Sequence, residues 1–127
     1  SLLHPLNGLQ QGKAGKTYHN VCPADAADGF LRGYNLGKAE HDQRRRVESL
    51  ENQIRQSEYR ISELKEKIAK GEIEAKAGEG EIRRMHRDIQ RLRFEKQRKE
   101  LDLRAIERDG EIFAANPDMV IPPRYRY

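Results

Sequence analysis

The chain has 127 residues, of which 35% are hydrophobic and 36% are charged, and it contains no tryptophan. This length corresponds to about one domain, but the low apolar content excludes a thick globular core and favours long helices that each bury one stripe. The net charge is +4, yet sixteen basic residues balance sixteen acidic ones over residues 47–113. That balance disfavours a basic rod that lies along nucleic acid.

Residues 1–43 are expected to form a glycine-rich helical module. Residues 5–15 read as a short helix, with Pro5 in its first turn and Gly15 in the left-handed position after its end. A second helix is expected to begin near Ala24. Glycines four residues apart share one face of each helix, so we expect the two helices to pack closely, a flexible and poorly helical segment being the alternative. The expected packing residues are Gly8, Gly12, Gly29, Gly33 and Gly37.

Residues 44–113 carry the heptad pattern of a coiled coil. A continuous helix that dimerises in parallel and an antiparallel hairpin both fit this pattern. We favour the hairpin, with its turn near residues 76–80, because three glycines within residues 71–80 disfavour a continuous helix. In that hairpin Ile68 faces Met85 and Leu64 faces Ile89. The expected seam residues are Val47, Leu50, Ile54, Ile61, Leu64, Ile68, Met85, Ile89, Leu92, Leu103 and Ile106.

Residues 114–127 are expected to form an extended tail. Prolines at 117, 122 and 123 prevent the preceding helix from continuing. The final residues, RYRY, alternate cations and aromatic rings in a way that stacking segments share, but a disordered or partner-docked end explains them equally well.

We expect no catalytic, cofactor-binding or metal-binding residues, and therefore no enzyme. A structural zinc site needs four converging ligands, whereas only His19 and Cys22 are closely spaced, and the single cysteine excludes a disulfide within the chain. No apolar run reaches the roughly 18 residues that cross a bilayer. The basic cluster over residues 83–99 is more typical of a coiled-coil exterior than of an anion site. Its candidate residues for contact with an anion or a partner are Arg83, Arg84, Arg87, Arg91 and Lys99.

Three motifs follow one another over residues 4–40: NGLQQGKAG, YHNVCP and FLRGYNLG. They resemble a family of bacterial envelope proteins, many of them lipoproteins, that is known as domain of unknown function 2799. The matching positions are Asn7, Gly8, Gly12, Gly15, Tyr18, Val21, Cys22, Pro23, Phe30, Gly33, Tyr34 and Gly37. The resemblance implies an exported protein with no assigned activity. Members of the family often have a cysteine before the NG pair, where this chain has SLLHP, so Cys22 is either free or paired with another chain.

These observations together predict an all-α protein: a glycine-packed helical pair, an antiparallel coiled-coil hairpin and an extended C-terminal tail. The expected function is that of a non-enzymatic structural or protein-interaction component of the bacterial periplasm or envelope. The alternative is a basic surface that binds nucleic acid or an anionic lipid or polymer. We expect a protein partner, a homodimer being one form of it, and we disfavour nucleic acid. Membrane association through a lipid anchor, which is not present in this sequence, is compatible with this expectation, and without the family resemblance a cytoplasmic location would be expected.

Overall fold

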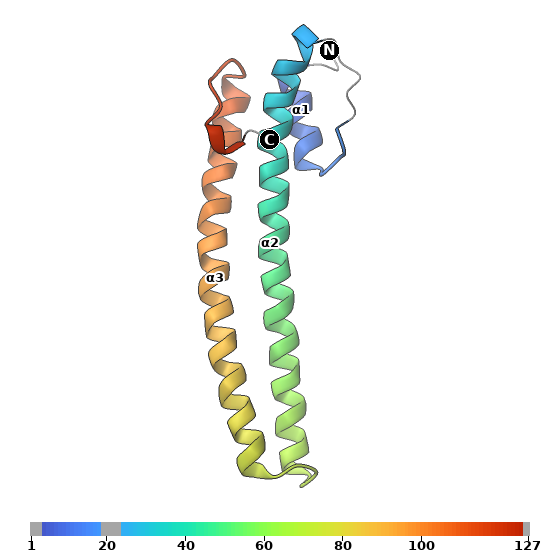
Figure 1. Ribbon diagram of the computed structural model, residues 1–127, viewed down its shortest axis with the longest axis vertical. Coiled ribbons are helices and arrows are strands. Elements are labelled where there is room, and N and C mark those ends of the chain that lie inside the picture. The colour runs from blue at the N-terminus through green and yellow to red at the C-terminus, as the bar shows by residue number, and fades with distance from the viewer. Residues whose placement is uncertain (1–3, 19–23, 126–127) are drawn as a thin grey trace. The chain divides into compact units, whose positions relative to one another are not determined.

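The computed structural model describes residues 4–18 and 24–125, and only the backbone of residues 24–27. Its elements in chain order are α1 (Pro5–Lys13), α2 (Ala24–Ala69), α3 (Ala75–Ala115) and a short 3₁₀ helix, η1 (Pro123–Tyr125) (Figure 1). The described residues contain helices and no strand, which confirms the expected all-α class and the helical hairpin.

Contacts divide the chain into two compact units. Unit 1 comprises residues 1–45 and 100–127, and unit 2 comprises residues 46–99. The sequence pattern placed residues 100–113 in the coiled coil and the tail apart from the helical module. The contacts instead group both segments with the first forty-five residues.

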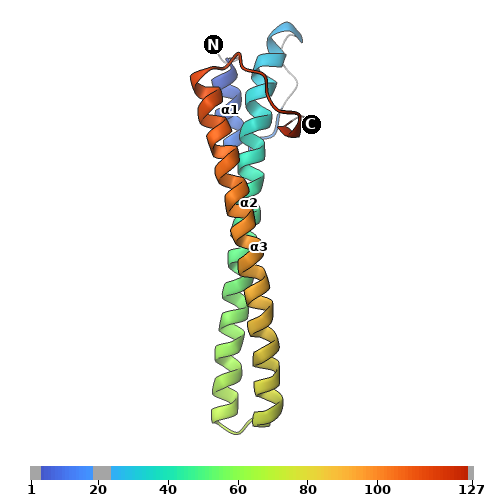
Figure 2. The same ribbon diagram turned by 90° about the vertical axis from the view of Figure 1, so that its left-hand side faces the viewer.

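Unit 2 is an antiparallel pair made of the last part of α2 and the first part of α3 (Figure 2). α2 ends in a Schellman motif: Gly71 has φ 72°, its backbone N–H donates to Ile68, and Glu72 donates to the Lys67 carbonyl at 2.9 Å. The turn therefore lies at residues 70–74, and the expected turn near 76–80 is wrong because those residues belong to α3. The alternative of one continuous helix does not hold, because α2 ends at Ala69 and α3 begins at Ala75, whereas the favoured hairpin is confirmed.

The earlier turn changes the pairing of the two helices in unit 2. A Cβ atom built at Gly78 would lie 2.7 Å from Cδ1 of Ile68, so Ile68 packs against Gly78. The expected partner of Ile68 was Met85, one heptad further along α3. A slide of one heptad keeps apolar positions opposite apolar positions, and for this reason the seam pattern does not distinguish the two pairings.

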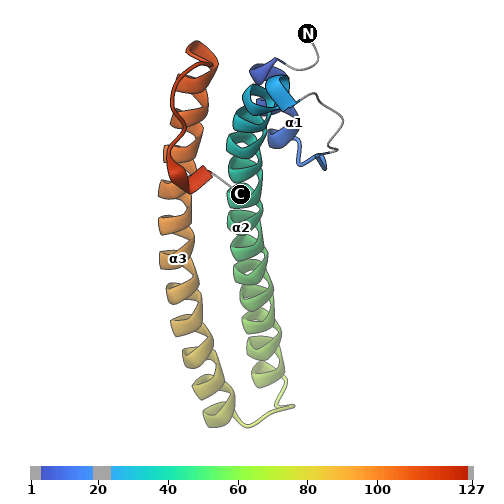
Figure 3. The ribbon, with the colours of Figure 1, turned by 45° about the horizontal axis from the view of Figure 1, so that its top comes forward.

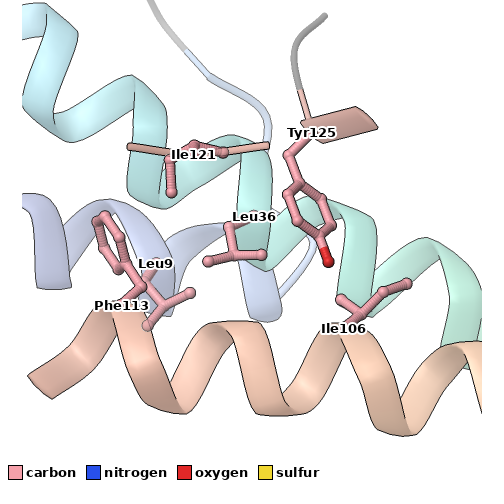
Figure 4. Close-up of a cluster of buried hydrophobic side chains, with 6 residues drawn as sticks. All are labelled: Leu9, Leu36, Ile106, Phe113, Ile121 and Tyr125. Atoms are coloured by element: carbon pink, nitrogen blue, oxygen red, sulfur yellow. The ribbon is translucent and has the colours of Figure 1, made fainter. Parts of the chain in front are cut away.

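Unit 1 packs α1, the first part of α2, the last part of α3 and the C-terminal segment around one apolar cluster. Figure 4 shows side chains from all four segments converging there: Leu9, Leu36, Ile106, Phe113, Ile121 and Tyr125. Figure 3 shows the C-terminal segment running back beside α3 instead of extending away. The expectation of an extended tail is therefore wrong, because burial of Ile121 and Tyr125 holds this segment on the core.

Candidate interaction site

The interface of α1 with α2 is built from backbone contacts. A Cβ atom at Gly33 would lie 2.8 Å from the backbone nitrogen of Leu9, and one at Gly37 would lie 2.7 Å from that of Lys13. Real Cβ atoms do not approach so closely, so a larger side chain at either glycine would displace α1.

The reciprocal contacts come from the glycines of α1. A Cβ atom at Gly12 would lie 2.7 Å from the backbone nitrogen of Lys38, and one at Gly8 would meet the carbonyl oxygen of Phe30 and lie 3.0 Å from the nitrogen of Tyr34. The two helices thus interlock, and their close approach replaces side-chain packing with direct backbone contact.

Gly29 differs from the other expected packing glycines. A Cβ atom there would lie 3.2 Å from Cγ of Pro5, which is a side chain and not backbone. The interlock therefore consists of two glycines on each helix, and Gly29 lies at its edge.

Aromatic side chains cover one flank of this interlock. The rings of Tyr18, Phe30 and Tyr34 lie with their centroids 5.7–6.4 Å apart. The hydroxyl of Tyr34 also donates to the carbonyl of Lys16 at 2.7 Å, which ties the segment after α1 to α2.

The C-terminal segment is fastened to α3 by a clasp of Tyr125, Arg124 and Asp109. Tyr125 and Arg124 both donate to the same Asp109 oxygen, Oδ2. Partial burial opposes ionisation of Asp109, but these hydrogen bonds outweigh it and hold the pKa of the carboxyl below its ordinary value. Burial, reinforced by the bond to Asp109, raises the pKa of Tyr125, so its phenol stays protonated and remains a donor.

The same segment meets α2 around Arg32. One Nη atom of Arg32 donates to the carbonyl of Met119 at 3.2 Å, and Nε lies 3.6 Å from the carboxylate of Asp28. A surface hollow of about 470 Å³ adjoins this arginine, with apolar and polar walls. Its lining residues are Asp28, Leu31, Arg32, Asn35, Val120, Ile121 and Tyr125.

The expected seam residues are buried or half-buried. Those that are buried are Val47, Leu50, Ile54, Ile61, Ile89, Leu92 and Ile106, and those that are half-buried are Leu64, Ile68, Met85 and Leu103. Near the turn of unit 2, Ile68 and Ile82 line a hollow of about 390 Å³ together with Lys65, Glu79 and Arg83. Two ion pairs also join the helices of unit 2, Glu58 with Arg93 at 3.7 Å and Glu51 with Lys96 at 3.6 Å.

The outer face of α3 in unit 2 carries a row of cations. Positions spaced by three or four residues share this face, and we call the row they form the α3 ridge. Its members are Lys76, Gly80, Arg83, Arg87, Arg91, Phe94 and Arg98, all exposed except the half-buried Gly80. Phe94 is 64% exposed, and the guanidinium of Arg98 lies 5.8 Å from its ring centroid.

Two of the candidate contact residues lie off this ridge. Arg84 forms an ion pair with Glu81 at 3.3 Å on the flank of α3. Lys99 occupies a seam position and is half-buried. Arg91 belongs to the ridge and lies 3.8 Å from Asp88, in an exposed pair that contributes little to stability.

The described residues show no grouping of three or more His, Cys, Asp or Glu side chains that would hold a metal ion. His19 and Cys22 lie outside the described residues. Within the described part of the chain, no helix combines the length and apolar character of a membrane span. Comparison of the chain with protein-family models, with curated proteins and with solved structures finds no match. The proposed function therefore rests on the structure of the chain and on the resemblance over residues 4–40.

Proposed function

We propose that this chain is a non-enzymatic structural and protein-interaction component of the bacterial cell envelope, with the coiled coil of unit 2 as a surface for partners. The envelope location derives from the resemblance over residues 4–40. The structural role is supported by the way in which unit 1 is locked: backbone interlock on one side and a hydrogen-bonded clasp on the other. Groups of this kind fix the geometry of unit 1, which is what a structural role requires.

Photo-crosslinking in bacterial cells tests this proposal. Benzoylphenylalanine replaces Tyr59, which is 68% exposed in unit 2, or Val120, which is 82% exposed beside the hollow of unit 1. We expect a discrete covalent adduct with an envelope protein from at least one position. The absence of an adduct at both positions, in cells that contain the folded chain, would contradict the proposal.

A matched control distinguishes a docked partner from random encounter. Benzoylphenylalanine at Gln90, an exposed position of α3 in unit 2, samples the same solution as Tyr59 from the other helix. A specific partner gives adducts whose yields differ sharply between these two positions, whereas random collision gives similar yields at both.

A second candidate function is binding of an anionic surface, and one observation favours it. The outer face of α2 presents residues at the same spacing as the α3 ridge: Glu48, Asn52, Arg55, Tyr59, Glu63, Glu66 and Lys70. This α2 row has three acids against two cations, whereas the α3 ridge has five cations and no acid. Unit 2 therefore has one strongly cationic edge. Salt-dependent binding of an anionic surface, weakened by loss of ridge arginines, is the expected result.

A further inference from the structure

We propose that the α3 ridge docks unit 2 on an anionic lipid membrane, with Phe94 inserted among the headgroups. This inference rests on the second candidate function and names its partner. The ridge lies on one helix face and spans about 33 Å, from the helical rise over residues 76–98. Its members project from a convex surface along one line.

The shape of the ridge favours a plane over a polymer. Five cations on one line of a helix can all touch a flat surface at the same time. The backbone of duplex DNA curves away from a straight helix, so it would meet only part of the row. Glu81, Asp88 and Glu95 flank the ridge on one side of α3 and would repel a polyanion that wraps around it.

Phe94 provides the second part of the argument. Its ring is 64% exposed on a convex ridge, so a bilayer interface can bury it without a preformed pocket. Arg98 stacks on this ring, which places a guanidinium beside the point of insertion, where it can bind lipid phosphate while its stem packs on the ring.

The magnitude of the electrostatic attraction is sufficient for reversible binding. Each basic residue near an anionic leaflet raises partitioning by about a factor of five, and the attraction falls with added salt. Five such residues act together on the ridge, with the aromatic ring in addition. The α2 row has no comparable excess of cations, so unit 2 would bind through its α3 edge.

Tryptophan fluorescence of the full chain tests the proposal, because the chain contains no tryptophan. Phe94→Trp places a single reporter on the ridge, and Tyr59→Trp places the matched reporter on the α2 row. Vesicles of phosphatidylcholine with 30% phosphatidylglycerol should shift the emission of the Phe94→Trp chain to the blue, and pure phosphatidylcholine vesicles should not. The Tyr59→Trp chain should show no shift with either. Equal shifts for both reporters, or no shift at position 94, would overturn the proposal.

Charge reversal separates the ridge from the general charge of the chain. Arg87→Glu with Arg91→Glu should lower partitioning onto phosphatidylglycerol vesicles by about a hundredfold or more, since each reversal removes a cation and adds an anion. Arg55→Glu with Lys70→Glu makes the same change of net charge on the α2 row and should leave partitioning within about a factor of five. Equal loss in both double variants would contradict docking through the ridge.

A third arm distinguishes the membrane from other anions. Duplex DNA or polyglutamate, added to the Phe94→Trp chain at the same total negative charge as the vesicles, should produce a smaller blue shift. A larger shift with either polymer would reject the membrane in favour of that polymer. A chain that does not bind vesicles can still form photo-crosslinked adducts at Tyr59. Failure of the membrane proposal is therefore distinguishable from failure of the first proposed function.

Discussion

The hydroxyl of Tyr125 donates a hydrogen bond to the carboxylate of Asp109, and Arg124 binds the same oxygen. This contact joins the C-terminal segment to the last part of α3. It also places Tyr125, which is 2% exposed, against the apolar cluster of unit 1. This carboxylate therefore helps to position the segment that completes the core of unit 1.

Removal of that charge should weaken unit 1. We expect Asp109→Asn to lower the free energy of unfolding by about 1–2 kcal/mol at neutral pH, because hydrogen bonds to a charged acceptor are lost. Asp102→Asn, at an exposed site on the same helix, is the control and should change stability by less than about 0.5 kcal/mol. Urea denaturation followed by circular dichroism measures both.

The stabilising effect of Asp109 should also depend on pH. The pKa of Asp109 is lowered in the folded chain, so its stabilising effect is fully present above the unfolded value of about 3.9. The effect disappears as the pH falls through the lower, folded-state pKa. The stability difference between the wild type and Asp109→Asn should therefore be constant above about pH 5 and shrink in stronger acid. A stability difference that grows on acidification would show that the ionised Asp109 carboxylate destabilises the folded chain instead of stabilising it.

Alanine substitutions should separate the glycines by their surroundings. Gly33→Ala places a Cβ atom against the backbone of α1 and should destabilise the chain by about 1–3 kcal/mol. Gly80→Ala meets only arginine side chains at 3.7 Å or more, and it should stabilise α3 by up to about 1 kcal/mol. Equal effects of the two substitutions, measured by thermal unfolding, would refute the interlock.

Engineered disulfides should report the pairing of helices in unit 2. In a Cys22→Ser background, Ile68→Cys with Gly78→Cys should oxidise to a cross-linked monomer, because Ile68 packs against Gly78. Ile68→Cys with Met85→Cys should not close, since seven residues span about 10 Å along a helix and a disulfide needs Cα atoms within about 7 Å. Non-reducing gels and intact mass distinguish the two pairings. If only the Ile68→Cys with Met85→Cys pair forms a disulfide, the register expected from the sequence is the correct one.

Substitution of two phenylalanines of α3 by alanine should change the stability of the chain by very different amounts. Phe113 is fully buried, so Phe113→Ala should lower the free energy of unfolding by about 3–5 kcal/mol. Phe94 is mostly exposed, and Phe94→Ala should change stability by less than about 0.5 kcal/mol. Chemical denaturation of both variants checks this contrast, and a large loss in Phe94→Ala would mean that its ring supports the fold.

The sequence was sufficient to predict the helices and the contact between α1 and α2. Apolar residues at heptad spacing identify the seam, and glycines four apart identify bare faces that fit together. The start of α2 near Ala24 and the left-handed conformation of Gly15, with φ 71°, also follow from local signals. The signals for these features are local in the sequence, although the contact between α1 and α2 itself joins residues more than twenty positions apart.

The turn of the hairpin was not predictable in the same way. Gly71, Gly78 and Gly80 are equal as breakers of a helix, but only Gly71 takes a positive φ. Gly78 is instead a helical residue that makes room for Ile68 on the facing helix. Because a heptad pattern repeats, the seam accepts either pairing, and only the tertiary contact selects one.

The clasp and the α3 ridge were missed for different reasons. Nothing in the local sequence relates Asp109 to Tyr125, since their contact depends on a C-terminal segment that folds back. The spacing of the arginines already places the ridge on one face of the helix. Treating all cations of residues 83–99 as one cluster, however, also includes Arg93 and Lys96. These two residues lie on other faces and pair with glutamates of α2. Sorting the cations by helix face would have found it.

Unit 1 gathers Leu9 from the start of the chain and Tyr125 from its end into one cluster. During synthesis on the ribosome, α1 and the first part of α2 emerge long before the residues that cover their apolar side. Unit 2 has all its residues available earlier, and its contacts close over a short turn, so it should form first. Until translation passes Tyr125, the nascent chain carries an uncovered apolar surface, and this interval is when a chaperone would be needed most.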